Sequence, residues 1–524
     1  MTNGPRRAAA VLGGLALLAA LQPPPAAAAD PPAPAGGIAW AECPPELLDL
    51  IPGDDHLYDC ATLDVPRDHA DPGGPETAID LVRRRAADPD RRIGPLVLAS
   101  GGPGVPGAVH AAYAPSLFQQ EVLDRFDLVG YNPRGWRADC FDSAEQEQEL
   151  LARLDPAPLG GDGVEQALAA HRELGEACAR NEGELLPHLS STAAAHDLDL
   201  VRAALGEERL NFFGMSQAGL IGTVYADLYP ERVRALVLDS PVDATRRTTR
   251  PLEYDRARAQ GHEEALGAAL ELCAEAGDRC PFGGGDPRAA MTEIRDRLYQ
   301  GPVEMPDGEV VTLGKLVTEL RSALGVMPAL SPVPLDGVFQ RLAELHGQAG
   351  GPPSGAPGPA APGPGGGAGA AAYPTDNRSA FYGINCADRP YPADQGEVEP
   401  AARQWEQEYP VFGRAQAYEQ FPACASWPAP PESPYPGPSE PRTEEPPLVL
   451  SNRHDAPTPP AFAERMAGAL DGRLIVVEDA FGHGALGTSR CADDAVTAYL
   501  TRLQAPPEES VCAPDDAPWP EGSA

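Results

Sequence analysis

The chain has 524 residues, 42% of them hydrophobic, which is enough for a large buried core or for two domains. Its formal net charge is −37. A chain this acidic should be repelled by nucleic acid and by anionic lipid surfaces, so we exclude both as partners and expect a soluble extracellular protein.

Residues 1–29 have the layout of a secretory signal peptide. Two arginines precede the apolar run AAAVLGGLALLAAL, and small residues follow it up to Ala29, where we expect cleavage. The apolar run is too short to span a bilayer, and no later stretch of the sequence is a candidate span. The sequence therefore predicts a secreted protein from which the signal peptide is removed.

Strands and helices alternate between residues 30 and 244. This alternation predicts an α/β fold with a mostly parallel sheet that helices cover on both faces. The predicted elements are a strand in 78–84, a strand and glycine-rich loop over 94–107, a strand in 125–136, a helix over 193–205, a strand over 210–213, a helix from 216 to 229 and a strand in 232–243.

The alternation stops after residue 244 and returns after residue 440. Residues 245–440 read as helical and irregular, and we interpret them as an inserted cap. Within them, the Gly/Pro/Ala-rich stretch 347–374 cannot build a packed core and is predicted to be a disordered loop. Residues 441–524 again contain two strands and two helices, which complete the α/β core.

The stretch GMSQA, residues 214–218, lies between a predicted strand and a predicted helix. This context is typical of a nucleophile elbow, Gly-x-Ser-x-Gly, in which a strained turn exposes the serine oxygen. Small residues are needed two positions before and after the serine, and Gly214 and Ala218 are small. We predict that Ser216 is a nucleophile; the alternative is an idle serine in an ordinary turn.

A serine hydroxyl needs a base, and in an α/β-hydrolase the chain order is serine, acid, histidine. Asp455 follows the predicted strand at 447–450, and His483 follows the predicted strand at 473–477. In these roles Asp455 would orient the imidazole and His483 would take the proton of Ser216.

Three other residues compete for these roles. Asp239 and Asp243 follow an earlier strand and are alternative acids, although capping of a helix is their default role. His454 adjoins Asp455 but follows the wrong strand for the base. We therefore rank all three behind Asp455 and His483.

Acyl transfer also needs backbone N–H groups that stabilise the oxyanion. We expect one from Gln217, which follows the nucleophile, and one from the loop SGGPGVPG, where Gly102 is the first choice and Gly101 the second. Taken without Ser216, this loop could equally be a plain glycine turn. The mechanism uses only side chains and backbone, so we expect no cofactor.

The ten cysteines are even in number, and in an exported chain they predict disulfides. There is no C-x-x-C and no Cys/His cluster with zinc spacing, so we expect no metal site. Ten cysteines allow about 945 pairings. The simplest is sequential: Cys43–Cys60, Cys140–Cys178, Cys273–Cys280, Cys386–Cys424 and Cys491–Cys512.

Several segments resemble the secreted bacterial tripeptidyl aminopeptidases, α/β-hydrolase serine peptidases that are similar to prolyl iminopeptidases and carry a TAP-like C-terminal segment. The segments are GGPGVPG, FDLVGYNPRG, AAHDLDLVRAALGEERLNFFGMSQAG, YPERVRALVLDSPVD, INCAD, HDAPTPP and GHGALGTSRC, which together extend from about residue 40 to about residue 515. The resemblance implies that Ser216, Asp455 and His483 form the triad, and sequential disulfides suit the family's cysteine layout. It also implies cleavage of short units from a free peptide N-terminus under a cap that limits substrate length.

The chain departs from the family pattern near the chemistry. Gln217-Ala218 replaces Tyr-Gly after the serine, Pro106 stands where the family has Ser, and Asn132 where it often has Asp. An aminopeptidase also needs an acid for the substrate's α-ammonium group. Asp388 is a weak candidate for this substrate-binding role, and a local backbone bond is the alternative.

We predict an exported serine hydrolase that forms an acyl-serine intermediate on a peptide or small acyl substrate. The leading function is an aminopeptidase that releases tripeptides or short N-terminal units. The first alternative is an esterase or amidase acting on small acyl substrates. The second is a catalytically silent binding protein with the α/β-hydrolase fold, which the changes at Gln217-Ala218 and Pro106 would suit.

Overall fold

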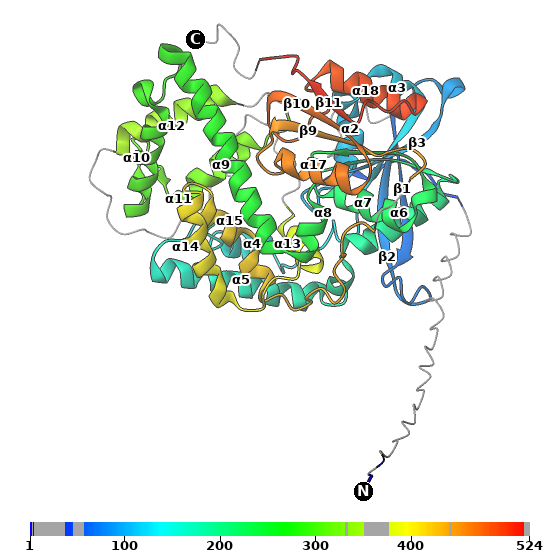
Figure 1. The fold of residues 1–524 in the computed structure, drawn as a ribbon, viewed down its shortest axis with the longest axis horizontal. Coiled ribbons are helices and arrows are strands. Elements are labelled where there is room, and N and C mark those ends of the chain that lie inside the picture. Colours follow the sequence, from blue (N-terminus) through cyan, green and yellow to red (C-terminus); the bar gives the residue numbers. More distant parts are fainter. Residues whose placement is uncertain are drawn as a thin grey trace.

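The computed structural model describes residues 1–2, 4, 37–45, 57–330, 334–349, 377–439 and 443–517 (Figure 1). Most of the predicted signal peptide, residues 3 and 5–29, lies outside the described residues, as does 350–374 of the predicted disordered loop. The first three residues of that loop are helical instead, because they end helix α12 (Leu335–Ala349). Among the described residues, no helix combines the length and the apolar character that a membrane span requires.

A nine-stranded sheet forms the centre of the fold. Strands β1 and β2 pair antiparallel, as do β2 and β4, and all other neighbours pair parallel, which confirms the mostly parallel sheet. The sequence analysis did not predict the two edge strands, β1 and β11. In spatial order the strands are β1 (Tyr58–Pro66), β2 (Glu76–Arg84), β4 (Phe126–Tyr131), β3 (Gly94–Ala99), β5 (Leu210–Met215), β6 (Val233–Asp239), β9 (Leu448–His454), β10 (Arg473–Phe481) and β11 (Glu509–Cys512).

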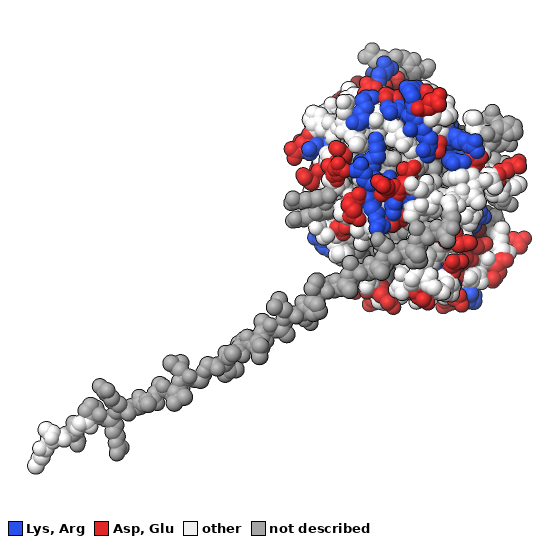
Figure 2. Space-filling model, turned by 90° about the vertical axis from the view of Figure 1, so that its right-hand side faces the viewer, with Lys and Arg blue, Asp and Glu red and all other residues white. Residues whose placement is uncertain are grey.

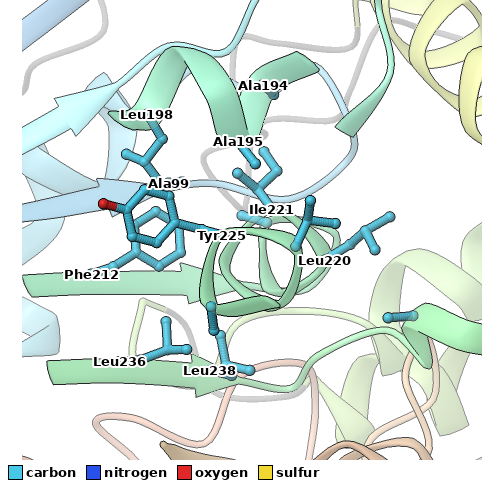
Figure 3. Close-up of a cluster of buried hydrophobic side chains, with 14 of the residues drawn as sticks. Ala99, Ala194, Ala195, Leu198, Phe212, Leu220, Ile221, Tyr225, Leu236 and Leu238 are labelled. Atoms are coloured by element: carbon cyan, nitrogen blue, oxygen red, sulfur yellow. The ribbon is translucent and has the colours of Figure 1, made fainter. Parts of the chain in front are cut away.

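Helices cover both faces of this sheet, as the continuous apolar runs of the inner strands require. One face packs against α6 (Ser191–Ala204), α7 (Ala218–Leu228) and α17 (Pro460–Ala469), and the other against α2 (Ala108–Leu117), α3 (Gln120–Arg125) and α18 (Arg490–Arg502). Figure 3 shows part of the first interface, where Phe212 and Leu236 of the sheet lie beside Ile221 and Tyr225 of α7. The next residues along these strands, Phe213 and Val237, belong to the core on the opposite face.

The helical segment between β6 and β9, which we predicted to be a cap, lies beside one end of the sheet and contributes most of two further hydrophobic cores (Figure 1). One of these cores also contains α4 (Ala144–Leu151) and α5 (Gly160–Glu182), which precede the predicted cap in sequence. The other elements are α8 (Ala244–Thr249), α9 (Pro251–Ala276), α10 (Pro287–Gln300), β7 (Val303–Glu304), β8 (Val310–Val311), α11 (Leu313–Leu324), α12, α13 (Arg378–Asp388), α14 (Val398–Glu408), α15 (Gly413–Glu419) and α16 (Phe421–Cys424).

All ten cysteines form the five sequential disulfides that we expected. Cys43–Cys60 joins the segment before the sheet to β1, where Ala41 also bridges to Cys60. Two of the bridges, Cys140–Cys178 and Cys386–Cys424, lie in the same cap core. Two segments that are far apart in the sequence therefore pack in one hydrophobic core, and each segment contains its own disulfide.

Arginine and acidic side chains lie next to one another on the face shown in Figure 2, toward which the β1–β2 edge of the sheet points. Ion pairs along this edge include Arg85 with Asp59 and Arg91 with Asp88. The positive charges of these arginines are therefore compensated locally, and each such pair contributes little to stability because it is exposed to solvent.

Arg134, in the turn after β4, joins three parts of the core from a buried position. Its guanidinium donates to both carboxylate oxygens of Asp197 on α6, at 2.5 and 2.6 Å. It also donates to the carbonyls of Pro66, Arg67 and His188. The two side chains are 1% and 0% exposed, so the pair is a buried ion pair that holds the end of β1 and the start of α6 on the sheet.

We expect Arg134→Met to lower the free energy of unfolding by about 3–5 kcal/mol, because it leaves the buried Asp197 carboxylate with only His69 Nε2, at 2.8 Å, as a charged or ionisable partner. Chemical denaturation with the disulfides intact measures the change. Arg91→Met is the control, since its side chain is 59% exposed and its removal should change stability little. Equal effects of the two substitutions would contradict the role of Arg134.

Candidate active site

The predicted nucleophile sits on a strained turn between β5 and α7. Ser216 has a φ of 58°, a left-handed backbone conformation that non-glycine residues rarely adopt. Three backbone hydrogen bonds hold it: its N–H donates to Asp239 O at 2.9 Å, and its carbonyl accepts from Gly219 at 3.0 Å and Val242 at 3.3 Å. The strained conformation is thus fixed by neighbours on two elements, as a nucleophile elbow requires.

The positions around Ser216 are as tight as the motif predicts. A methyl group at Gly214 would lie 2.7 Å from the carbonyl oxygen of Ala218, and one at Gly219 would lie 2.8 Å from Pro241 Cβ. Ala218 itself is fully buried in the core between α7 and the sheet. Its methyl group is accommodated there, so the departure from Gly-x-Ser-x-Gly does not disturb the elbow.

The structure brings the predicted acid and base together. His483, in the loop after β10, lies with Nδ1 at 3.1 and 3.0 Å from the two carboxylate oxygens of Asp455, in the loop after β9. Thr458, which the sequence analysis missed in this role, donates its N–H to Asp455 at 2.9 Å and places its hydroxyl 3.1 Å from His483 Nδ1. His454 instead stacks on Phe481, with ring centroids 4.4 Å apart.

The charge of Asp455 sets the basicity of His483. Burial alone would lower the pKa of His483, but the Asp455 carboxylate, assisted by Asp239, raises this pKa above its ordinary value of 6.5. Because Nδ1 faces Asp455, Nε2 is the nitrogen left to accept a proton. Among the described residues Nε2 has no hydrogen bond with Ser216 Oγ, and such contacts commonly close only when substrate binds.

Asp239 joins the loop that carries His483 to the turn that carries Ser216. Its carboxylate accepts the N–H groups of Ala485 at 2.8 Å and Leu486 at 3.0 Å, just after His483. Its carbonyl accepts the N–H of Ser216. Asp239 therefore binds backbone and is not the partner of the imidazole.

The second alternative acid is also engaged elsewhere. Asp243 caps α8 by accepting the N–H of Arg246 at 3.1 Å, and it pairs with Arg465 at 2.6 Å. Helix capping, its default role, is the role that the structure assigns to it.

The predicted oxyanion loop packs directly on the nucleophile. A methyl group at Gly101 would lie 2.5 Å from Ser216 Cβ and 2.9 Å from Ser216 Oγ, so Gly101, our second choice, is the residue in contact. Gly102 follows with a φ of 102°. Within the described part of the chain, the N–H groups of Gly102 and Gln217 donate to no protein acceptor, which leaves both available to a ligand.

The side chain of Gln217 enters a buried network that sequence reasoning missed. Its amide donates to the hydroxyl of Ser191 at 2.7 Å. Ser191 in turn donates its hydroxyl and its N–H to the two oxygens of Asp388, at 2.6 and 2.7 Å. Asp388 is 4% exposed, and burial raises its pKa although the nearby Arg247 opposes the rise. Both of its oxygens are thus bound at the start of α6, an arrangement that does not suit an ammonium anchor.

Two family models match parts of the chain. A family model described as "alpha/beta hydrolase fold" matches residues 94–278, which include the Ser216 elbow. A model described as "TAP-like protein" matches residues 409–512, which include Asp455 and His483.

Similar curated proteins cover most of the chain. The tripeptidyl aminopeptidase of Streptomyces lividans is 29% identical over 93% of this chain and 89% of the relative. The serine protease Hip1 of Mycobacterium tuberculosis is 29% identical over 86% of this chain and 87% of that protein. Carboxylesterase B of Mycobacterium tuberculosis is 28% identical over 87% and 86%.

Among solved structures, the proline iminopeptidase of Mycobacterium smegmatis is 13% identical over 84% of this chain and 97% of that chain, with a TM-score of 0.35. The fold assignment rests on the family model and on the sheet topology. The chain has the α/β-hydrolase fold, is a relative of the tripeptidyl aminopeptidases and is a serine hydrolase.

We expect Gly101→Ala to lower kcat by about 100-fold or more, because the new methyl group displaces either Ser216 or the oxyanion loop. Steady-state hydrolysis of a chromogenic ester measures the effect. Gly468→Ala is the matched control, since a methyl group at this position on α17 meets no atom within 4 Å. An unchanged kcat in Gly101→Ala would place the reaction away from this loop.

The raised pKa of His483 predicts the pH dependence of activity. A base must be neutral, so we expect kcat/KM to rise with pH along a limb whose midpoint lies above 6.5. Asp455→Asn should lower kcat by about 10⁴-fold. It should also move the limb to lower pH, because it removes the main charge that favours protonation of His483.

The same pair affects stability with a defined sign. Because the folded-state pKa of His483 is raised, its contribution to stability is present below pH 6.5 and is lost as pH rises through the raised value.

His454→Gln is the control for the pH–rate profile and should leave the midpoint of the acid limb unchanged. A limb that stays in place in Asp455→Asn would contradict the pairing.

Proposed function

Because the chain is an α/β-hydrolase related to the tripeptidyl aminopeptidases over 93% of its length, we propose that it is an exported aminopeptidase. Its products are tripeptides or other short units from the free N-termini of peptides. One arrangement carries the proposal. Asp455 is hydrogen-bonded to His483, and Asp239 joins the His483 loop to the strained turn at Ser216.

The proposed reaction proceeds through an acyl-serine. Ser216 Oγ attacks the scissile carbonyl while His483 Nε2 takes its proton, and Asp455 stabilises the resulting imidazolium. The N–H groups of Gln217 and Gly102 stabilise the oxyanion of the tetrahedral intermediate. His483 then returns the proton to the leaving amine, and a water molecule, activated by the same base, releases the acyl group from the serine.

Two further features support the proposed setting. Five disulfides suit an oxidising extracellular compartment, in agreement with the signal-peptide layout of residues 1–29. The cap at 245–440 contacts the base directly, since His483 N–H donates to Val326 O at 2.9 Å. We propose that this cap bounds the substrate site and so limits substrate length.

An aminopeptidase needs an anion for the substrate's α-ammonium group, and Asp388 is occupied. A cavity of about 610 Å³ between α9 and the loop after β9 offers other carboxylates. Asp455, Glu263 and Glu264 line it together. Glu264 is exposed, whereas one oxygen of Glu263 already accepts the N–H groups of Val411 and Phe412. We propose Glu264 as the first position to test for the anchor and Glu263 as the second.

A second candidate function is an esterase acting on small acyl substrates. Two observations favour it: one relative is named carboxylesterase B, and Asp388 is not free to bind an amine. An ester substrate requires no ammonium anchor.

Incubation of the protein with a mixture of free and N-acetylated peptides, followed by mass spectrometry, tests the aminopeptidase. We expect tripeptides to leave only the free peptides, and Ser216→Ala to release none. If neither set is cut, an ester panel separates the esterase from a silent fold. Labelling of Ser216 by a fluorophosphonate, absent in Ser216→Ala, would argue against the silent alternative.

A further inference from the structure

One buried acidic residue outside the proposed triad binds the loops of both Ser216 and His483, the first through its backbone carbonyl and the second through its carboxylate. Asp239, the last residue of β6, is 2% exposed. We propose, building on the proposed function, that Asp239 is a positioning residue of the reaction. It fixes the His483 loop relative to the nucleophile elbow and adds a second negative charge beside the base.

The bonds of Asp239 reach the two loops with different parts of one residue. Its carboxylate oxygens each accept one N–H of the His483 loop, from Ala485 and from Leu486. Its carbonyl accepts the N–H of Ser216 at 2.9 Å. A displacement of Asp239 therefore changes the separation of nucleophile and base directly.

Other groups hold the His483 loop but do not reach the elbow. The amide of Asn452 donates to the carbonyls of Gly482 at 3.1 Å and Gly484 at 2.9 Å. Val326 of the cap accepts the N–H of His483. The hydroxyl of Ser240, which follows Asp239, accepts the N–H of Gly484 at 3.0 Å. None of these groups bonds to Ser216, whereas Asp239 binds both the His483 loop and the N–H of Ser216.

Three charged groups surround the imidazole. Asp455 and Asp239 favour its protonated form, and Arg258 of α9 opposes it. Burial, with a smaller contribution from the Asp455 charge, raises the pKa of Asp239, while the N–H groups of Ala485 and Leu486 and the nearby His483 oppose the rise. Because each carboxylate oxygen accepts an N–H, the geometry suits the ionised form. It thus contributes charge as well as geometry.

Asp239→Asn tests both contributions. The substitution keeps the size of the side chain but removes the charge and one of the two acceptors. We expect kcat to fall by about 10- to 100-fold, because misplacement by about 1 Å is enough for such a loss, while KM stays near its original value. We also expect the acid limb of kcat/KM to move to lower pH.

Asp243→Asn is the matched control, since Asp243 is also 2% exposed, lies four residues away and caps α8 without bonding to either catalytic loop. It should leave kcat and the acid limb unchanged even where it lowers the melting temperature. If the Asp239→Asn limb does not move, or if its kcat falls no further than that of Asp243→Asn, the proposal is overturned.

A second variant keeps the test decisive if Asp239→Asn does not fold. Asp239→Glu retains the charge but displaces it, so kcat should fall while the acid limb stays at its original pH. An unchanged kcat would overturn the proposal. Hydrolysis that persists in Ser216→Ala would count against the proposed function and not against the role of Asp239.

Discussion

The left-handed backbone at Ser216 is the constraint on which the rest of the site depends. A φ of 58° exposes the serine oxygen at the end of β5, and a non-glycine residue keeps such a conformation only when its surroundings enforce it. Here Gly214 and Gly101 leave space on two sides, and the carbonyl of Asp239 holds the serine N–H on a third. The strained turn at Ser216 therefore depends on residues of three neighbouring strands and not on the pentapeptide alone.

The carboxyl edge of the sheet collects the remaining groups. In a parallel sheet the loops that follow the strands meet at this edge, so the loops after β5, β6, β9 and β10 converge although more than 260 residues separate Ser216 from His483. Hydrogen bonds then fix the relative positions of these loops. Thr458 binds Asp455, and Asp239 binds the loop of His483. The cap completes the same arrangement through Val326.

Prediction from the sequence succeeded where the signal was local. Periodicity placed β3, β5, β6, β9 and β10 close to their observed positions. Chain order, together with position after a late strand, selected Asp455 and His483, which the structure places in contact. It missed β11, which has only four residues, and β1, whose nine residues do not alternate regularly between buried and exposed positions. It also placed α5 in the core, because burial against distant helices leaves no mark in the helix itself. The sequence also could not predict that Ser191 binds Asp388, because the two residues are almost 200 positions apart.

The sequence by itself determined the α/β architecture, the strained turn at Ser216, the order of acid and base and the even set of cysteines. These follow from hydrophobic period, residue size and chain order, which are properties of neighbouring residues. Only the tertiary structure decided which carboxylate faces His483, which one holds its loop, and that Gln217 is bound to Ser191 and Asp388. The physical reason is that hydrogen bonds and charge interactions act over a few ångströms in space, and the folding of the sheet and cap decides which distant residues come within that range.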